Sequence, residues 1–135
     1  MSEREKSCGA VLFMTHAGQR LYLVLHSVKG HWTLCKGHVE GTETELQTAR
    51  REIKEETGLQ VSFIDGFRQV ISYQPAPQVD KDVVFFLAST DGLGLICQPE
   101  EISEACFMPF DQAMRRLTHA SDQQVLMAAE AFVKG

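Results

Sequence analysis

The chain has 135 residues, 44% of them hydrophobic, and a formal net charge of −5. This length and apolar content predict one globular domain over residues 1–135, and the acidic balance argues against binding along an extended nucleic acid, which requires many exposed Lys and Arg. A small anionic substrate needs only a local basic patch and stays possible. No run approaches the ~18 apolar residues of a membrane span, and the four cysteines form no C-x-x-C pair, so we expect reduced thiols in a cytoplasmic protein.

The first half of the chain predicts a hairpin, a loop and a helix. Apolar, β-favouring runs at 8–15 and 20–28 flank the turn-rich "HAGQ". The interval 28–42 is rich in Gly, His and Lys without a clear period, which indicates a loop that passes a site. The T-x-x-E pattern of Thr42 and Glu45 predicts a helix that starts near residue 43 and ends before Gly58. Its expected buried stripe consists of Leu46, Ala49, Ile53 and Thr57.

The second half predicts further strands and two helices. The β-rich runs 59–73 and 82–90 are separated by Pro75 and Pro77, which are expected to break the chain between them. Residues 109–120 and 121–135 are predicted to be helical, and Ser121 with Gln124 is expected to cap the second helix. This order of elements predicts an α+β fold with a mixed sheet flanked by helices.

Three carboxylates cluster near the end of the first predicted helix, on a face separate from the buried stripe. Residues at i, i+3 and i+4 share a helix face, so Glu52, Glu55 and Glu56 project toward one point. Hard divalent ions such as Mg²⁺ take oxygen ligands and bridge to substrate phosphates, so this spacing predicts a metal site. Arg51 is placed to pair with Glu55 one turn later and to hold the acids in place. The competing interpretation is a solvated charged helix face.

Residues 37–59 match the pattern G-x5-E-x7-R-E-U-x-E-E-x-G-U, in which U is a bulky apolar residue, at every specified position. This segment resembles the Nudix box, which favours the metal site over the solvated face. The resemblance implies a Nudix-type α/β/α sandwich with a mixed β-sheet between helices. It also implies hydrolysis of a nucleoside diphosphate linked to a further moiety, with Mg²⁺ or Mn²⁺ as the cofactor.

The resemblance assigns roles to individual residues of the box. The implied metal ligands are Glu52, Glu55, Glu56 and the Gly37 carbonyl. Arg51 and Glu43 are implied to orient them. The general base is implied to be Glu55 or a carboxylate outside the box. The segment "QPEEISEACF" resembles one that contributes a further Glu in relatives; Glu101 is the best match, with Glu100 and Glu104 as alternatives.

The flanks of the box resemble the diadenosine tetraphosphate hydrolase branch of the family. The matching stretches are "HWTLCKGHVE", "DGFRQVISY" and "KDVVFFLA". By this resemblance Lys36 and Lys81 contact phosphates, as point cations suited to a polyphosphate chain. Tyr73 stacks on adenine, although a place at the rim of the core is an equal alternative for it. His38 matches the "KGHVE" motif and is expected to face phosphate.

The sequence departs from this branch at two positions. Cys35 stands where the branch usually has Pro, which predicts a less rigid approach to Lys36. "LTHASD" stands where many relatives read L-T-Y-P-x-D, so His119 is expected to replace the second aromatic that holds the base, with less stacking area. Trp32 is expected to pack near the mouth of the pocket.

The leading functional hypothesis is asymmetric hydrolysis of a dinucleoside polyphosphate, with diadenosine tetraphosphate giving ATP and AMP. A second hypothesis is a pyrophosphatase for modified nucleoside triphosphates, capped RNA ends or nucleotide sugars. A third is a non-catalytic Nudix module that binds a nucleotide, against which the intact box argues. The partner implied in each case is a small-molecule nucleotide, and the sequence predicts no particular oligomeric state.

Overall fold

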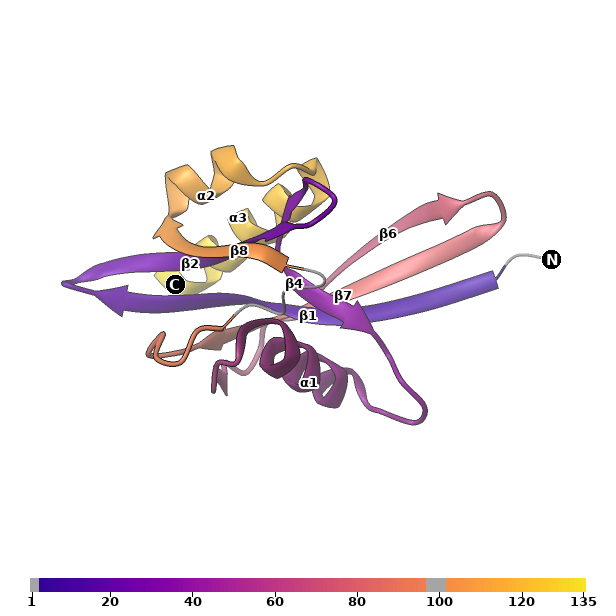
Figure 1. The fold of residues 1–135 in the computed structure, drawn as a ribbon, viewed down its shortest axis with the longest axis horizontal. Coiled ribbons are helices and arrows are strands. Elements are labelled where there is room, and N and C mark those ends of the chain that lie inside the picture. Colours follow the sequence, from indigo (N-terminus) through magenta and orange to yellow (C-terminus); the bar gives the residue numbers. More distant parts are fainter. Residues whose placement is uncertain (1–2, 97–101) are drawn as a thin grey trace.

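The computed structural model describes residues 3–96 and 102–135 of the chain. A mixed sheet lies between α1 (Glu45–Thr57) on one face and α2 (Phe110–Arg116) with α3 (Ala120–Lys134) on the other (Figure 1). This layered arrangement confirms the predicted fold class, α+β with a mixed sheet between helices. Within the described ranges, no helix is both long and apolar enough to cross a membrane.

The sheet is organised around β1, the longest strand. The strands are β1 (Glu3–His16), β2 (Gln19–Ser27), β3 (Trp32–Thr33), β4 (Cys35–His38), β5 (Ser62–Phe63), β6 (Gln69–Ala76), β7 (Val79–Ser89) and β8 (Ile102–Pro109). The central path runs β3-β2-β1-β7-β5, while β4 pairs with β1, β6 with β7 and β8 with β2. The β1–β7 pairing is parallel, and the β1–β2 and β1–β4 pairings are antiparallel. The predicted hairpin of the first two strands is confirmed.

Both faces of the sheet are apolar because helices cover both of them. On the α2/α3 side, Val11 and Phe85 pack with Leu126 of α3 in one core cluster. On the α1 side, Leu12 and Ile53 belong to a second cluster. Successive strand residues point to opposite faces, so Val11 and Leu12 of the same strand serve the two clusters.

Strand β4 lies unusually close to β1, and a glycine permits this. A Cβ atom at Gly9 would overlap the backbone carbonyl of Cys35. The pairing places Gly9 opposite Lys36 and Cys8 opposite Gly37, so it carries the start of the box onto the central strand. The chain from 28 to 42 was predicted to be a loop; it instead contains β3 and β4, because its backbone groups pair with β2 and β1.

Helix α1 ends as predicted but starts later. Gly58 adopts the left-handed conformation, with φ of 70°, and its N–H bonds the Lys54 carbonyl. The predicted cap at Thr42 is wrong: Thr44 is the N-cap and forms a reciprocal capping box with Gln47. Glu45, the expected partner of Thr42, instead bonds Lys6 and Arg68.

The buried stripe of α1 is confirmed for three of its four members. Ala49, Ile53 and Thr57 are buried, whereas Leu46 in the first turn is exposed. The sheet lies against the later turns of the helix, where Ala49 and Ile53 join core clusters, so the prediction for Leu46 is wrong.

Predictions for the later elements need several corrections. Pro75 lies inside β6, at the register irregularity between Tyr73 and Ala76, and the turn begins only at Pro77; an edge strand tolerates such a proline. Helix α2 ends at Arg116 rather than at residue 120. Helix α3 begins at Ala120 after His119, without a side-chain cap, so the predicted Ser121–Gln124 cap is wrong. Strand β8 was not predicted.

Candidate functional site

A cleft of about 1040 Å³ opens beside β4, between α1 and the start of α3. It is lined by side chains from β1, β4, α1, β6 and β7, together with the segment that begins α3. Nine of the residues singled out from the sequence line it: Lys36, Gly37, His38, Glu52, Glu55, Glu56, Tyr73, Lys81 and His119. Segments far apart in sequence therefore meet around one space.

The carboxylates of α1 form one wall of the cleft, but their exposure differs. Glu55 is 47% exposed, as expected of a solvated helix face. Glu52 is mostly covered, and Glu56 is only 6% exposed. The expectation that the acids lie on a face separate from the buried stripe is correct for Glu55, but Glu56 is itself buried, because Cys35 of β4 packs against its carboxylate.

Arg51 holds several acceptors in a fixed arrangement. Its guanidinium donates to Glu43 at 2.7 and 3.1 Å, to Glu52 at 2.7 Å and to Glu55 at 3.1 Å, and also to the His38 carbonyl at 2.8 Å. The Glu43 hydrogen bond, and then Glu52, raise the pKa of Arg51, and the Arg51 hydrogen bond lowers the pKa of Glu43 to about 2. The predicted Arg51–Glu55 pair is confirmed, and the guanidinium also ties α1 to the end of β4.

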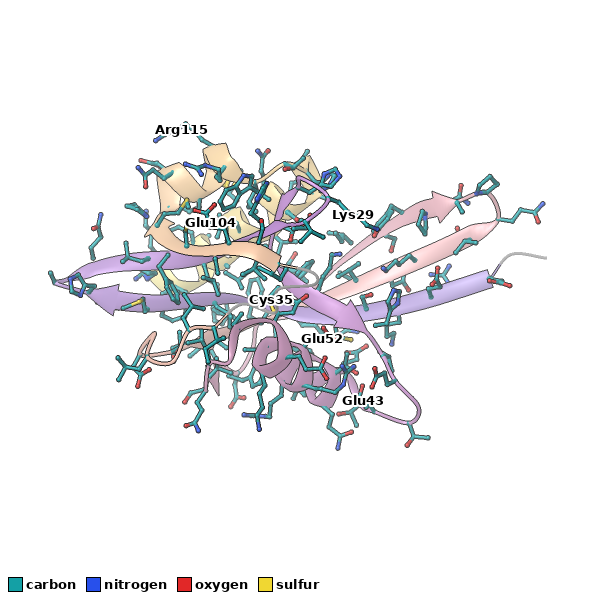
Figure 2. The ribbon with its side chains drawn as sticks, viewed as in Figure 1. Lys29, Cys35, Glu43, Glu52, Glu104 and Arg115 are labelled. Atoms are coloured by element: carbon teal, nitrogen blue, oxygen red, sulfur yellow. The ribbon has the colours of Figure 1, made fainter. Side chains whose placement is uncertain are left out.

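Two residues of β4 face the acids of α1 at close range, where Figure 2 shows Cys35 and Glu52 near each other. A Cβ atom at Gly37 would overlap the Glu52 carboxylate, so only glycine fits at this position without displacing that acid. The Cys35 thiol donates to Glu56 Oε1 at 3.0 Å. Burial, followed by the charge of Glu56, raises the pKa of the Cys35 thiol, so it remains a neutral donor.

The donor set of this wall suits a hard divalent cation. Glu52, Glu55 and Glu56 offer carboxylate oxygens to one cleft, and Gly37 brings its backbone beside them. Among residues 3–96 and 102–135 there is no ready-made group of three His, Cys, Asp or Glu side chains around a metal position. Magnesium does not need one, because it commonly binds one or two carboxylates and keeps waters or phosphate oxygens as its other ligands. The residues present therefore fit such an ion.

The opposite side of the cleft carries positive charge. Lys36 projects from β4 and Lys81 from β7, and His38 lines the same space. Lys81 is only 9% exposed. Burial, and then the nearby charge of Lys36, lowers the pKa of Lys81. A bound anion would relieve both effects, since it compensates the lost hydration and the repulsion between the two ammonium groups.

Tyr73 and His119, the two residues predicted to hold the base, both line the cleft. Tyr73 of β6 pairs in register with Lys81, and its side chain is 44% exposed. His119 stacks on His31, with ring centroids 5.1 Å apart. Trp32 packs between His26 and Arg116, at 4.7 and 4.8 Å between group centres, in keeping with the expected packing role.

One predicted site residue cannot be placed. Glu101 lies outside the described residues, as does Glu100, and the neighbouring Ile102 lines the cleft. Glu104, the other alternative, lies on β8 (Figure 2) and is not among the described residues that line the cleft. The role of Glu101 stays a prediction.

Among the cleft residues that sequence reasoning did not single out, two are buried and polar. Asp122 in the first turn of α3 is buried, and burial raises the pKa of its carboxyl against the opposing effect of Lys36. In the sequence it resembles an ordinary acid at a helix start. Ser7 of β1 is fully buried at the cleft and looks in the sequence like the polar flank of a strand. Asp122 is the last residue of the "LTHASD" stretch but was given no role there, and Ser7 lies outside the motifs.

The sequence matches one protein family and several characterised proteins. The NUDIX domain family matches residues 4–129. The asymmetrical bis(5'-nucleosyl)-tetraphosphatase of Mus musculus is 38% identical over 94 residues, which are 62% of this chain and 63% of that protein. The chain thus spans about 63% of the length of the first curated relatives that it matches.

Two further comparisons bear on the fold and the site. The crystal structure of a C. elegans Ap4A hydrolase binary complex superposes with a TM-score of 0.89 at 27% identity, covering 97% of this chain and 98% of that one. The 8-oxo-(d)GTP phosphatase of Mycolicibacterium smegmatis is 36% identical over 103 residues, 76% of this chain and 30% of that protein.

Proposed function

The chain belongs to the Nudix family, and from this premise we propose that it is a hydrolase of the pyrophosphate linkage in nucleoside-diphosphate-linked compounds. Its preferred substrate class is the dinucleoside polyphosphates. Diadenosine tetraphosphate would be cleaved asymmetrically, so that one water molecule is consumed and ATP and AMP leave.

One observation carries this proposal: an acidic wall and a basic wall face the same cleft. Glu52 and Glu55 line it from helix α1, and Lys36 and Lys81 line it from strands β4 and β7. A polyphosphate needs cations along its chain and, at the phosphorus under attack, a group that withdraws charge and one that accepts a proton. A cleft of about 1040 Å³ also has room for a ligand larger than one nucleotide.

Divalent metal use is general among Nudix hydrolases, and Mg²⁺ or Mn²⁺ is our proposal for this chain. Glu52, Glu55 and Glu56 would hold the ion, with the Gly37 carbonyl as a further ligand. When bound, such an ion supplies positive charge beside the phosphate oxygens and favours deprotonation of the attacking water. Arg51 keeps the Glu52 and Glu55 carboxylates in position through its hydrogen bonds at 2.7 and 3.1 Å.

The water that attacks phosphorus must lose a proton while the bond to the leaving phosphate breaks. Glu55 is the most exposed carboxylate of the α1 wall, and its oxygen lies 3.1 Å from Arg51, the longest of that guanidinium's bonds to the α1 acids. We assign it as the base that takes this proton. Glu101 remains the alternative base, and substitution of each acid tests the choice.

Substrate selection is assigned to the basic wall and the rings. Lys36, Lys81 and His38 would bind the phosphate chain, and Tyr73 would stack on the adenine. Tyr73 has 44% of its surface exposed while lining the cleft, which supports stacking over a place in the core rim. His119 would support the base from a second side, with its orientation fixed by stacking on His31.

The second candidate function is hydrolysis of a modified nucleoside triphosphate. Its support is the 36% identity to the relative named 8-oxo-(d)GTP phosphatase. Capped RNA ends and nucleotide sugars belong to the same alternative. A non-catalytic nucleotide-binding module is the third candidate, and any turnover would exclude it.

A substrate panel distinguishes these functions. Purified protein would be assayed with diadenosine tetraphosphate, 8-oxo-dGTP, a capped RNA and a nucleotide sugar, each with Mg²⁺ and with Mn²⁺, and the products separated by chromatography. We expect the highest kcat/KM for the tetraphosphate, with equal amounts of ATP and AMP. Glu55→Gln should be inactive, and Glu3→Gln, an exposed acid that is not among the described residues lining the cleft, serves as its control. Higher kcat/KM on 8-oxo-dGTP would promote the second candidate.

A further inference from the structure

The hydroxyl of Ser7 has no hydrogen-bond partner in the described part of the chain. The side chain is 0% exposed, and Ser7 Oγ is the one buried side-chain oxygen or nitrogen there that is left unsatisfied. Buried hydroxyls are nearly always hydrogen-bonded, because a hydroxyl that leaves water without a new partner loses free energy. An exception of this kind calls for a partner that is absent from the protein itself.

The position of Ser7 indicates where that partner would come from. Ser7 lines the cleft, in the middle of β1, with β4 on one side and β7 on the other. Its cross-strand partners are His38 on β4 and Val83 on β7, and the next residue, Cys8, pairs with Gly37.

The strand register places Ser7 midway between the two lysines. Lys81 pairs with Glu5, two residues before Ser7, and Lys36 pairs with Gly9, two residues after it. Residues 5 and 9 of a strand are about 13 Å apart, and the strands that carry the lysines lie about 4.8 Å to either side of β1, so the two lysine Cα atoms are roughly 16 Å apart. Extended lysine side chains cover most of that distance. Both lysines line the same cleft as Ser7, and after burial the charge of Lys36 is the next cause that lowers the pKa of Lys81.

A group that enters between two ammonium ions is an anion, and phosphate oxygens only accept hydrogen bonds when ionised. A serine hydroxyl offers one donor proton. We propose that Ser7 is an additional substrate-binding residue, whose hydroxyl donates to a non-bridging oxygen of the phosphate chain held between Lys36 and Lys81; this rests on the polyphosphate substrate class proposed above. Because the hydroxyl has no accessible surface in the ligand-free protein, the contact forms as the surrounding side chains adjust to the bound phosphates.

Two measurements on Ser7→Ala test this assignment together. Thermal unfolding of the ligand-free variant should give a Tm equal to or above that of the wild type, because the substitution removes an unsatisfied polar group. Calorimetric titration with inorganic tripolyphosphate, in EDTA so that hydrolysis does not occur, should show binding weakened about tenfold or more, the usual effect of losing a hydrogen bond to a charged group. A merely structural hydroxyl would lower Tm and leave the affinity unchanged.

Ser27→Ala is the matched control. Ser27 also lines the cleft, but its hydroxyl already accepts the His31 backbone N–H at 3.2 Å. We expect its affinity for tripolyphosphate to stay within about twofold of the wild type, a difference of about 0.4 kcal/mol.

The outcomes separate this inference from the proposed function. Equal tripolyphosphate affinity of Ser7→Ala and wild type, or no binding of tripolyphosphate to the wild type, overturns the role of Ser7 even if the wild type hydrolyses diadenosine tetraphosphate. A Ser7-dependent affinity in a protein that hydrolyses no member of the substrate panel supports the phosphate contact and overturns the hydrolase proposal.

Discussion

Gly37→Ala should abolish most activity while leaving the fold intact. The new methyl group would overlap the Glu52 carboxylate, which is the mobile end of a side chain and can swing away. Glu52 would then leave its position 2.7 Å from Arg51 and beside β4. We expect folding to accommodate this movement and the proposed metal site to lose a correctly placed carboxylate.

The size of the effect on activity and on Tm depends on which atoms the new methyl group would contact, as a comparison of two variants shows. For Gly37→Ala, misplacing one electrostatic group by about 1 Å lowers turnover by roughly 10²-fold, or about 2.7 kcal/mol of barrier. Gly9→Ala, on the strand paired with β4, would instead overlap the backbone of Cys35, which cannot rotate away. Overpacking of this kind costs about 1–3 kcal/mol and lowers Tm by roughly 3–15 °C in a domain of this size.

The assay is steady-state hydrolysis of diadenosine tetraphosphate with saturating Mg²⁺, combined with thermal unfolding of the wild type and both variants. We expect Gly37→Ala to stay within about 3 °C of the wild-type Tm, or about 1 kcal/mol, and Gly9→Ala to unfold earlier. Near-wild-type turnover by Gly37→Ala would refute the placement of Glu52 in the metal site. A fall in Tm as large as that of Gly9→Ala would refute the expectation that the Glu52 side chain moves away from the new methyl group.

Glu56→Gln should retain the fold but lose at least ~10²-fold in turnover; near-wild-type rates with saturating Mg²⁺ would remove Glu56 from the metal site. Tyr73→Ala should mainly raise KM, by the equivalent of ~1–3 kcal/mol of base stacking, and a selective fall in kcat would contradict stacking. Lys81→Ala should reduce kcat/KM more for diadenosine tetraphosphate than for a nucleoside triphosphate, and equal losses would favour the second candidate function. The Arg68 hydrogen bond lowers the pKa of Glu45 from 4.5 to about 2, so its contribution to stability is present above pH 4.5 and is lost as the pH falls toward 2. Glu45→Gln should therefore reduce the dependence of the unfolding free energy on pH between about pH 2 and pH 4.5. An unchanged dependence would show that Glu45 is not its cause.

The box helix was the part most accessible to sequence reasoning, because its determinants are local. Gly58 ends α1 in the left-handed conformation, and Arg51 reaches Glu55 one turn away, as the spacing predicted. The start was misplaced by two residues because two threonines compete there, and Gln47 rather than Glu45 completes the capping box at Thr44. Local spacing offers both choices, and the tertiary partners of Glu45 decide between them.

Elements whose backbone pairs with distant strands were predicted less well. The segment that contains β4 has no clear hydrophobic period, and it becomes a strand because β1 supplies its hydrogen-bond partners. Pro75 looked like a break, yet β6 accepts it because the only strand it pairs with in the described chain is β7.

By itself, the sequence determined the mixed α+β class, the acidic helix and its end, and the candidate residues for binding a metal ion and phosphates. Only the tertiary structure decided how they are brought together: β1 pairs with β4 on one side and with β7 on the other, which places Lys36 and Lys81 around Ser7. It also buried Glu56 beneath β4. Burial and unsatisfied hydrogen bonds depend on neighbours that are far away in the chain, and no local spacing of residues encodes them.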